Sequence, residues 1–222
     1  MTNIAKTTAY ITIPILACFI LFVLEQIMLV DYITKTCAKL LLFLGIPLLV
    51  HIVYKQDIIY RTSTVGLTSV LPGICIGAGV IVIILIAYLL FKSYIDAGSI
   101  MAELNEKSRI TKETYLYTGI YISLGNSFLE EFFFRKYIFL GLYRSGSVKL
   151  AYVASALLFS VYHLAIFNTW FSPTVLLLAL LGLLAAGLIL NYITAKTGSL
   201  LSSWIIHICS NIAIIGIGWS WL

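Results

Sequence analysis

Six polar side chains lie inside three apolar segments of the sequence, where they could together perform acid–base chemistry. An ionisable side chain in the hydrocarbon of a membrane is costly unless it is paired or hydrated, so each marks a candidate functional site. The set supplies carboxylates, imidazoles, a carboxamide and a guanidinium, which can activate a water molecule for attack on a carbonyl and stabilise the resulting oxyanion. The six residues are Glu130, Glu131, Arg135, His163, His207 and Asn211.

Helical spacing predicts how these side chains face one another. Glu131 and Arg135 are four residues apart, so they share a helix face and can form an ion pair. Glu130 lies about 100° around the helix from Glu131 and therefore points at a different neighbour. The same spacing of four places His207 and Asn211 on one stripe of the last apolar segment.

The three segments place their polar groups at a similar depth. With a rise of about 1.5 Å per residue, the groups lie between roughly 15 and 21 Å from charged residues at the ends of their helices. Those helix ends fall on one side of the membrane, so we expect a single buried polar cluster. Phe159 precedes His163 by one turn, where its ring can shield the imidazole from lipid.

Composition places the chain in a membrane. Of its 222 residues, 61% are hydrophobic and 10% are charged, whereas a soluble domain has about 45–50% apolar and about 25% charged residues. Several apolar runs exceed the about 18 residues needed to cross a bilayer. We therefore expect an all-α, polytopic helical bundle with about seven transmembrane helices, or eight, and exclude soluble enzyme folds. The predicted spans cover residues 8–30, 36–54, 67–91, 115–143, 149–170, 173–194 and 200–222.

The chain divides into two predicted units. Residues 1–114 hold the first three spans and a polar segment, 92–114, which we expect to be an interfacial or partly helical connection. Residues 115–222 hold the last four spans and all six polar side chains. Between the last two spans, Gly198 is expected to end one helix and Ser199 to cap the next.

Small residues in the apolar runs predict packing rather than chemistry. Gly73 with Gly77, and Gly182 with Ala186, have the spacing of close helix–helix contacts. The cysteines show no paired spacing, so we expect small buried apolar side chains rather than disulfides or a zinc site. They are Cys18, Cys37, Cys75 and Cys209.

The net charge of +5 comes from basic residues scattered among loops, without the stripe that nucleic acid binding needs. We therefore expect the lipid bilayer, and no nucleic acid, as a partner. Counting loop cations on the two sides favours an inside N-terminus only slightly, by seven to six. One side has Lys6, Lys55, Arg61, Lys136, Arg144, Lys149 and Lys196, and the other has Lys35, Lys39, Lys92, Lys107, Arg109 and Lys112.

Three motifs on successive predicted helices resemble those of the CPBP family of CAAX proteases and bacteriocin-processing enzymes, also called the Abi family. They are Glu-Glu-x-x-x-Arg at 130–135, Phe-x-x-x-His at 159–163 and His-x-x-x-Asn at 207–211. The approach to the last motif, from Gly187 to His207, is also similar to that of the family. The resemblance covers about residues 115–215, and the first three spans show no family signal.

The resemblance implies an intramembrane endopeptidase, with the catalytic core in residues 115–222, that hydrolyses a peptide bond with an activated water molecule. The substrate is expected to be a peptide or lipidated protein within the membrane, such as a prenylated, pheromone or bacteriocin-like chain. By the resemblance, Glu130 would be the general base, His163 its partner, His207 and Asn211 the oxyanion donors, Glu131 and Arg135 supporting residues, and Phe159 a substrate-binding residue.

The family has been described both as metalloproteases and as metal-free glutamate peptidases. We expect no cofactor, and the alternative is zinc held by Glu130, His163 and His207, which are zinc ligands by type. No His-Glu-x-x-His pair is present. Length, abundant Ile and the lack of targeting segments favour a multi-pass protein of the bacterial cytoplasmic membrane.

Two other functions fit the same residues. A catalytically silent membrane regulator or bacteriocin-immunity protein would keep the fold, although all six motif positions are intact. A proton-coupled transporter could use the Glu/His cluster as a relay, but its signature of broken helices and paired repeats is missing. Other polar residues in the spans, such as Asn126, are interpreted as helix-packing or interface groups.

Overall fold

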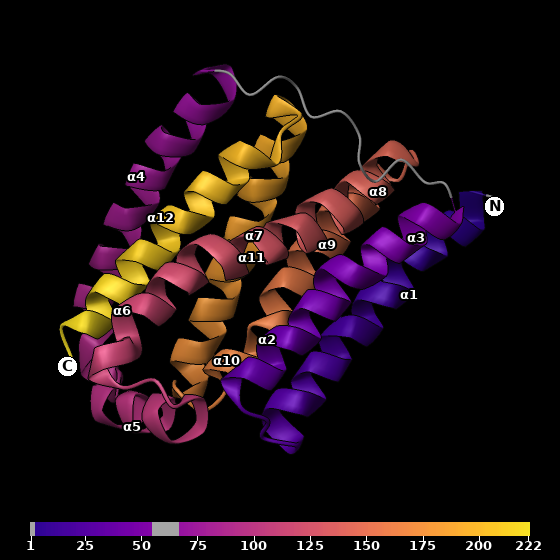
Figure 1. The fold of residues 1–222 in the computed structure, drawn as a ribbon. Helices are drawn as coiled ribbons and strands as arrows, with labels where there is room; N and C mark the ends of the chain where they lie inside the picture. Colours follow the sequence, from indigo (N-terminus) through magenta and orange to yellow (C-terminus); the bar gives the residue numbers. More distant parts are fainter. Residues whose placement is uncertain (1–2, 55–66) are drawn as a thin grey trace.

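The computed structural model describes residues 3–54 and 67–222, and over these ranges the protein is a bundle of helices (Figure 1). The only β-type pairing in the described residues is an isolated antiparallel bridge between Ile95 and Phe171. The predicted all-α class is therefore confirmed.

The first described segment forms a helical hairpin, drawn from indigo to purple in Figure 1. Asp31 begins its second arm, where the carboxylate accepts hydrogen bonds from the backbone N–H groups of Ile33 and Thr34. Such a side-chain cap satisfies donors that the first helical turn leaves free. The arms consist of α1 (Asn3–Phe22) with the π-helical η1 (Val23–Ile27), and α2 (Tyr32–Leu40) with the π-helical η2 (Leu41–Gly45) and α3 (Ile46–Tyr54).

After α4 (Leu67–Phe91), the polar connection is partly helical, as predicted. A 3-10 turn, η3 (Lys92–Tyr94), leads into α5 (Ala97–Ser108). Asp96 caps α5 by accepting hydrogen bonds from the Ser99 N–H and hydroxyl groups. These hydrogen bonds lower the pKa of the Asp96 carboxyl below its ordinary value of 3.8.

One continuous helical column crosses the bundle obliquely, between the α4–α12 pair and the N-terminal hairpin (Figure 1). Two of its parts are π-helical, with i→i+5 hydrogen bonds, a geometry found often at functional sites. The column consists of α6 (Lys112–Tyr121), η4 (Ile122–Asn126), α7 (Ser127–Glu130), η5 (Glu131–Phe139) and α8 (Leu140–Arg144).

The last helices pack around this column. Gly198 ends α11 with a left-handed φ of 64°, and the Ser199 hydroxyl accepts the Leu201 N–H at the start of α12, so the predicted turn is confirmed. The helices are α9 (Val148–Tyr162), α10 (Leu164–Phe167), α11 (Pro173–Thr197) and α12 (Leu200–Trp219).

Six helices in the described residues are long and apolar enough to cross a membrane, and each corresponds to a predicted span. The predicted fourth span, 115–143, is helical but does not belong to this set. It is too rich in charged residues, with four of them in one short stretch, and all four are buried inside the bundle. They are Glu130, Glu131, Arg135 and Lys136. The six are Thr7–Ile27, Tyr32–Ile52, Val70–Tyr94, Val148–Phe167, Pro173–Thr197 and Leu200–Trp219.

Glycines allow α4 and α12 to approach closely, and Figure 1 shows the two helices side by side. A Cβ atom on Gly73 would lie 3.0 Å from the Ser202 carbonyl oxygen, and one on Gly77 would lie 2.6 Å from Cys209 Sγ. The packing role predicted for this pair is confirmed. The same prediction is wrong for Gly182, where a Cβ would meet nothing within 4 Å in the described residues.

The neighbouring Gly187 makes the close contact instead. A Cβ atom there would lie 3.0 Å from Ala156 Cα, so α11 packs against α9 at this position. The stretch from Gly182 to Gly187 contains several small residues, and only the tertiary packing decides which of them faces α9.

The centre of the bundle is aromatic. The Phe43 and Phe133 rings stack with their centroids 4.0 Å apart and join the N-terminal hairpin to the column. Leu, Ile and Val side chains cover the outside, as expected for a surface that faces lipid.

Some side chains are placed differently from their predictions. The four cysteines are free as predicted, but the expected burial is wrong for Cys37 and Cys75, which are exposed on apolar outer faces. Lys39 and Lys136 are buried inside helices, so counting them as loop charges is wrong. Three other counted cations, Lys6, Lys55 and Arg61, have side chains outside the described part of the chain.

Candidate active site

The helical column places Glu130 and Glu131 in the interior of the bundle. Both carboxylates are buried, with exposed fractions of 1% and 0%. Because they are adjacent, they point in different directions, as the helical spacing predicts. The elements packed around them bring His163 from the end of α9 and His207 from α12. The predicted polar cluster is therefore formed.

The two oxygens of Glu130 have different surroundings. Oε1 accepts hydrogen bonds from Lys39 Nζ at 2.8 Å and from Asn126 Nδ2 at 2.9 Å. Oε2 lies 3.8 Å from His163 Nε2 and 3.7 Å from His207 Nε2. These last distances are too long for direct hydrogen bonds, so Oε2 and the two imidazole nitrogens face one another without bonding directly.

The other nitrogen of each imidazole is held by a hydrogen bond. His163 Nδ1 lies 2.7 Å from the Phe159 carbonyl oxygen, which can only accept, so Nδ1 carries the hydrogen. His207 Nδ1 lies 2.9 Å from Glu131 Oε1 and donates to that carboxylate. In the neutral imidazoles both Nε2 atoms are therefore acceptors that face Glu130.

Glu131 belongs to a supporting ion pair. Its Oε1 lies 3.4 Å from Arg135 Nη1, which confirms the predicted contact between the two residues. The Arg135 guanidinium is fully buried and lies over the Phe159 ring, 4.1 Å from the centroid. Its nitrogens make no hydrogen bond within the described residues, so the carboxylate and the aromatic ring are the neighbours that compensate its charge.

Phe159 packs edge-on against both imidazole rings. Its centroid lies 4.7 Å from that of His163 and 5.8 Å from that of His207. The ring is buried and covers the His163 imidazole as the sequence predicts, and it also contacts His207. A contact of Phe159 with substrate stays a prediction.

Asn211 shares a helix stripe with His207, but its side chain has another partner. Its Nδ2 donates to the Ile122 carbonyl oxygen in η4 at 3.2 Å. Within the described residues it is not hydrogen-bonded to Glu130 or to either histidine. The structure therefore brings five of the six predicted residues into mutual contact and leaves Asn211 at the edge of the group.

Two residues of the site, Lys39 and Asn126, are absent from the sequence-based assignment. The sequence pattern treats Lys39 as a loop cation and Asn126 as a packing or interface group. The available signals were a lysine inside the apolar run of the second span and an asparagine one helical turn before Glu130. An ionisable residue within a span is a functional candidate in its own right.

Comparison with family models finds a match over the second half of the chain. The model of the type II CAAX prenyl endopeptidase Rce1-like family covers residues 112–213. These residues contain the three motifs and every member of the buried cluster except Lys39. Over this stretch the chain is similar to CAAX proteases, and the match supports the family that the motifs resemble. No curated protein and no solved structure matches the chain.

The Rce1-like match begins at the first residue of α6 and ends within α12. It leaves out the N-terminal hairpin and α4, although the hairpin supplies Lys39 to the same cluster. With the apolar helices, the match supports an integral membrane protein that is similar to the CAAX prenyl endopeptidases.

The buried polar cluster has the residue types of a zinc site, but its charges are unfavourable for a zinc ion. Glu130, His163 and His207 are zinc ligands by type. However, the Lys39 ammonium group already compensates the Glu130 carboxylate at 2.8 Å and would repel a nearby dication. Within the described residues, no group of three or more His, Cys, Asp or Glu side chains is arranged to hold a metal ion. The arrangement does not fit a zinc site.

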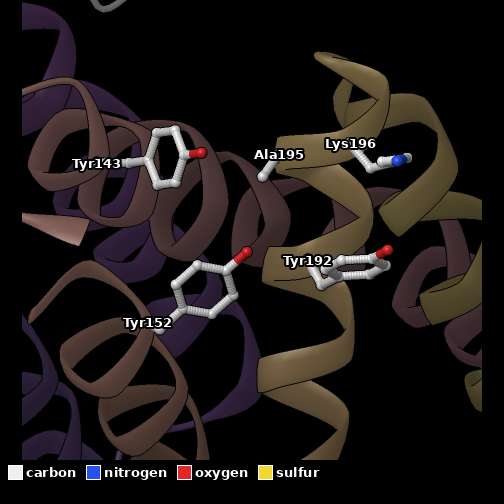
Figure 2. A pocket seen from close by; sticks show the side chains of 5 residues that line it. All are labelled: Tyr143, Tyr152, Tyr192, Ala195 and Lys196. Carbon is white, nitrogen blue, oxygen red and sulfur yellow. The ribbon is translucent and has the colours of Figure 1, made fainter. Parts of the chain in front are cut away.

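A hollow of about 190 Å³ lies away from this cluster, between the ends of α8, α9 and α11. Figure 2 shows the hydroxyl groups of Tyr143 and Tyr152 pointing toward Ala195 on α11. Tyr152 lies about 16 Å along α9 from His163, at 1.5 Å per residue. The hollow is therefore separate from the buried polar cluster. Its aromatic and basic side chains at helix ends are typical of the membrane interface.

Proposed function

We propose that this protein is an intramembrane endopeptidase in which Glu130 and His163 activate water without a metal ion. The observation that supports the proposal is the arrangement of Glu130 Oε2, His163 Nε2 and His207 Nε2 around one point. The imidazole nitrogens lie 3.8 and 3.7 Å from Oε2, too far for direct hydrogen bonds, so a water molecule between them can donate one hydrogen to Oε2 and the other to one of the nitrogens.

The proposed reaction begins when Glu130 Oε2 takes a proton from this water. The resulting hydroxide attacks the carbonyl carbon of the scissile peptide bond and forms a tetrahedral oxyanion. When the C–N bond breaks, the proton passes from Glu130, directly or through His163 Nε2, to the leaving amine. A carboxylic acid fragment and a free amine result, so atoms and charges balance.

His207 is the proposed oxyanion donor. In its protonated form both ring nitrogens carry hydrogen, so Nδ1 can keep its bond to Glu131 while Nε2 donates to the oxyanion. The Glu131–Arg135 pair holds the imidazole in this orientation. Asn211 could add a second donor after releasing the Ile122 carbonyl oxygen.

The proposed substrate is a peptide or lipidated protein in the bilayer, such as a prenylated, pheromone or bacteriocin-like chain. Its support is the family match together with the position of the cluster inside a membrane bundle. Phe159 is the proposed substrate-contacting aromatic residue next to both histidines. On the compositional grounds given above, we place the protein in a bacterial cytoplasmic membrane.

The test is cleavage of prenylated and non-prenylated membrane-anchored peptides by the purified protein, with and without a chelator. We expect cleavage that persists with the chelator and is lost in Glu130→Ala and His163→Ala, while both variants remain inserted in the membrane. Loss of wild-type activity on chelation, with recovery on adding zinc, would contradict the metal-free mechanism. Full activity in either variant would contradict the assigned roles, and no cleavage of any peptide would favour the silent regulator.

A further inference from the structure

Lys39 enters the site from outside the segment that carries the family motifs. It lies on the last turn of α2, where its side chain is buried among aromatic rings. The ammonium nitrogen lies 4.9 Å from the Tyr162 ring centroid and 5.6 Å from that of Phe43. These rings favour a cation at this point and direct the flexible lysine side chain toward the column.

A closed set of hydrogen bonds joins Lys39, Asn126 and Glu130. Lys39 Nζ donates to Asn126 Oδ1 at 2.5 Å and to Glu130 Oε1 at 2.8 Å, while Asn126 Nδ2 donates to the same Oε1 at 2.9 Å. Both donors act on one oxygen of the carboxylate. The hydrogen bonds therefore fix the rotation of the carboxylate and leave Oε2 facing the histidines.

The charges of the cluster are balanced in pairs. A buried carboxylate is stable only when a cation or several donors compensate it. Arg135 makes its ion pair with Glu131, and among the described residues Lys39 is the lysine or arginine that makes one with Glu130. Without Lys39, the Glu130 carboxylate would keep only the neutral donor Asn126 on Oε1.

We propose that Lys39 and Asn126 are positioning residues that hold Glu130 Oε1, so that Oε2 is the oxygen that takes the proton from water. This inference rests on the proposed function, because it assigns a role within the same reaction. It also gives the N-terminal hairpin a part in the site, since α2 carries Lys39 and the Phe43–Phe133 stack secures the adjoining η2 against the column.

The test compares Lys39→Met and Lys39→Arg with a matched control on the same helix. Lys35 lies one turn earlier and pairs with Glu25 at 2.6 Å, away from Glu130, so Lys35→Met removes an ion pair without touching the site. Steady-state kinetics on one membrane-anchored peptide would give kcat and KM for each purified variant. Thermal unfolding in detergent would show whether each variant is folded.

We expect Lys39→Met to lower kcat about 100-fold with little change in KM, because a small displacement of a catalytic group can have an effect of this size. Lys39→Arg should recover most of the loss, because it keeps a cation that donates hydrogen bonds. Asn126→Ala should lower kcat by a smaller factor, about 10-fold, since the ammonium group remains. Lys35→Met should keep the wild-type kcat.

Several outcomes would overturn the inference. We call the hydrogen bonds from Lys39 and Asn126 to Glu130 Oε1 the clamp. A folded Lys39→Met protein with wild-type kcat would show that the clamp is not needed. A rise in KM at unchanged kcat would place Lys39 in substrate binding instead. An equal loss in Lys39→Met, Lys39→Arg and Lys35→Met, in step with their unfolding temperatures, would show a purely structural role.

The same series separates this inference from the proposed function. If the wild-type protein cleaves the peptide and Glu130→Ala does not, the proposed function holds and the Lys39 variants test the clamp alone. If Glu130→Ala cleaves at the wild-type rate, both proposals fail together. The clamp fails by itself only when Glu130→Ala is inactive and folded Lys39→Met is fully active.

Discussion

Glu130 and Glu131 are adjacent in the sequence and equally buried, yet their surroundings differ. Glu131 bonds to His207 Nδ1 and contacts Arg135, so its partners orient other members of the cluster. Glu130 is held through Oε1 alone and presents Oε2 to two imidazole nitrogens at distances that allow a water molecule to bridge Oε2 and one of these nitrogens. The comparison shows that one position along a helix separates a carboxylate that orients a histidine from one that presents an oxygen to two imidazole nitrogens.

The difference arises from the elements that each side chain faces. Lys39 reaches Glu130 from α2, whereas Arg135 reaches Glu131 from the next turn of the same column. A local partner gives Glu131 a pairing that helical spacing can predict. Glu130 depends on a residue that is 91 positions away, so its pairing follows from tertiary packing.

After the loss of Glu130 itself, the largest expected effect comes from removing the His163 imidazole, one of the two that face Glu130. His163→Ala should lower kcat by about 10²–10⁴-fold, the usual contribution of a positioned acid–base group. His163 Nδ1 bonds to a backbone oxygen, so the change breaks no hydrogen bond between side chains at that nitrogen. Steady-state cleavage of a membrane-anchored peptide measures the effect. A loss below about 10-fold in folded protein would remove His163 from the reaction.

Removing Arg135, the cation that pairs with Glu131, should lower the stability of the protein as well as its activity. Arg135→Leu leaves the buried Glu131 carboxylate without its cation, so we expect the free energy of unfolding to fall by about 3–5 kcal/mol. Unfolding in mixed detergent measures it, with Arg135→Lys as the control that keeps the charge. Unchanged stability in Arg135→Leu would show that the hydrogen bond from His207 suffices to compensate the Glu131 carboxylate.

The smallest expected effect concerns Asp96, a carboxylate outside the spans that provides an exposed contrast to the buried pair. The hydrogen bonds from Ser99 hold the pKa of Asp96 below 3.8, so the charged form stabilises α5. The contribution of the charged Asp96 carboxylate to the stability of α5 is present above about pH 4 and is lost as the pH falls through the lowered pKa. Hydrogen exchange, corrected for its intrinsic pH dependence, should show the first turn of α5 opening on acidification. Asp96→Asn should weaken that pH dependence, and an unchanged profile would contradict the cap's role.

Local pattern predicted much of the site. The motif spacing identified Glu130, Glu131, Arg135, His163 and His207, and the structure places these five together. Apolar runs located the six helices that are long and apolar enough to cross a membrane. These successes rest on periodicities of helices and on the cost of polar groups in lipid, which act within short stretches of chain.

The remainder depended on long-range packing. The Lys39–Glu130 pair requires α2 to dock on the column, and no local signal states which carboxylate a lysine will meet. The π-helical segments around Glu130 and the choice of Gly187 over Gly182 as the contact with α9 also follow from neighbouring helices. The division into units 1–114 and 115–222 stays a prediction, although Lys39 contributes to the site across that boundary.

The most direct test of the account is a paired measurement of kcat for Glu130→Gln and Glu131→Gln on the same lipidated peptide. Both changes preserve side-chain shape, and detergent unfolding would confirm that both proteins are folded. The account predicts no measurable turnover for Glu130→Gln and a reduced but measurable turnover for Glu131→Gln, because the amide oxygen introduced by the second change can still accept the His207 Nδ1 hydrogen bond. Turnover in Glu130→Gln equal to or above that of Glu131→Gln would contradict the assignment of Glu130 as the water-activating base.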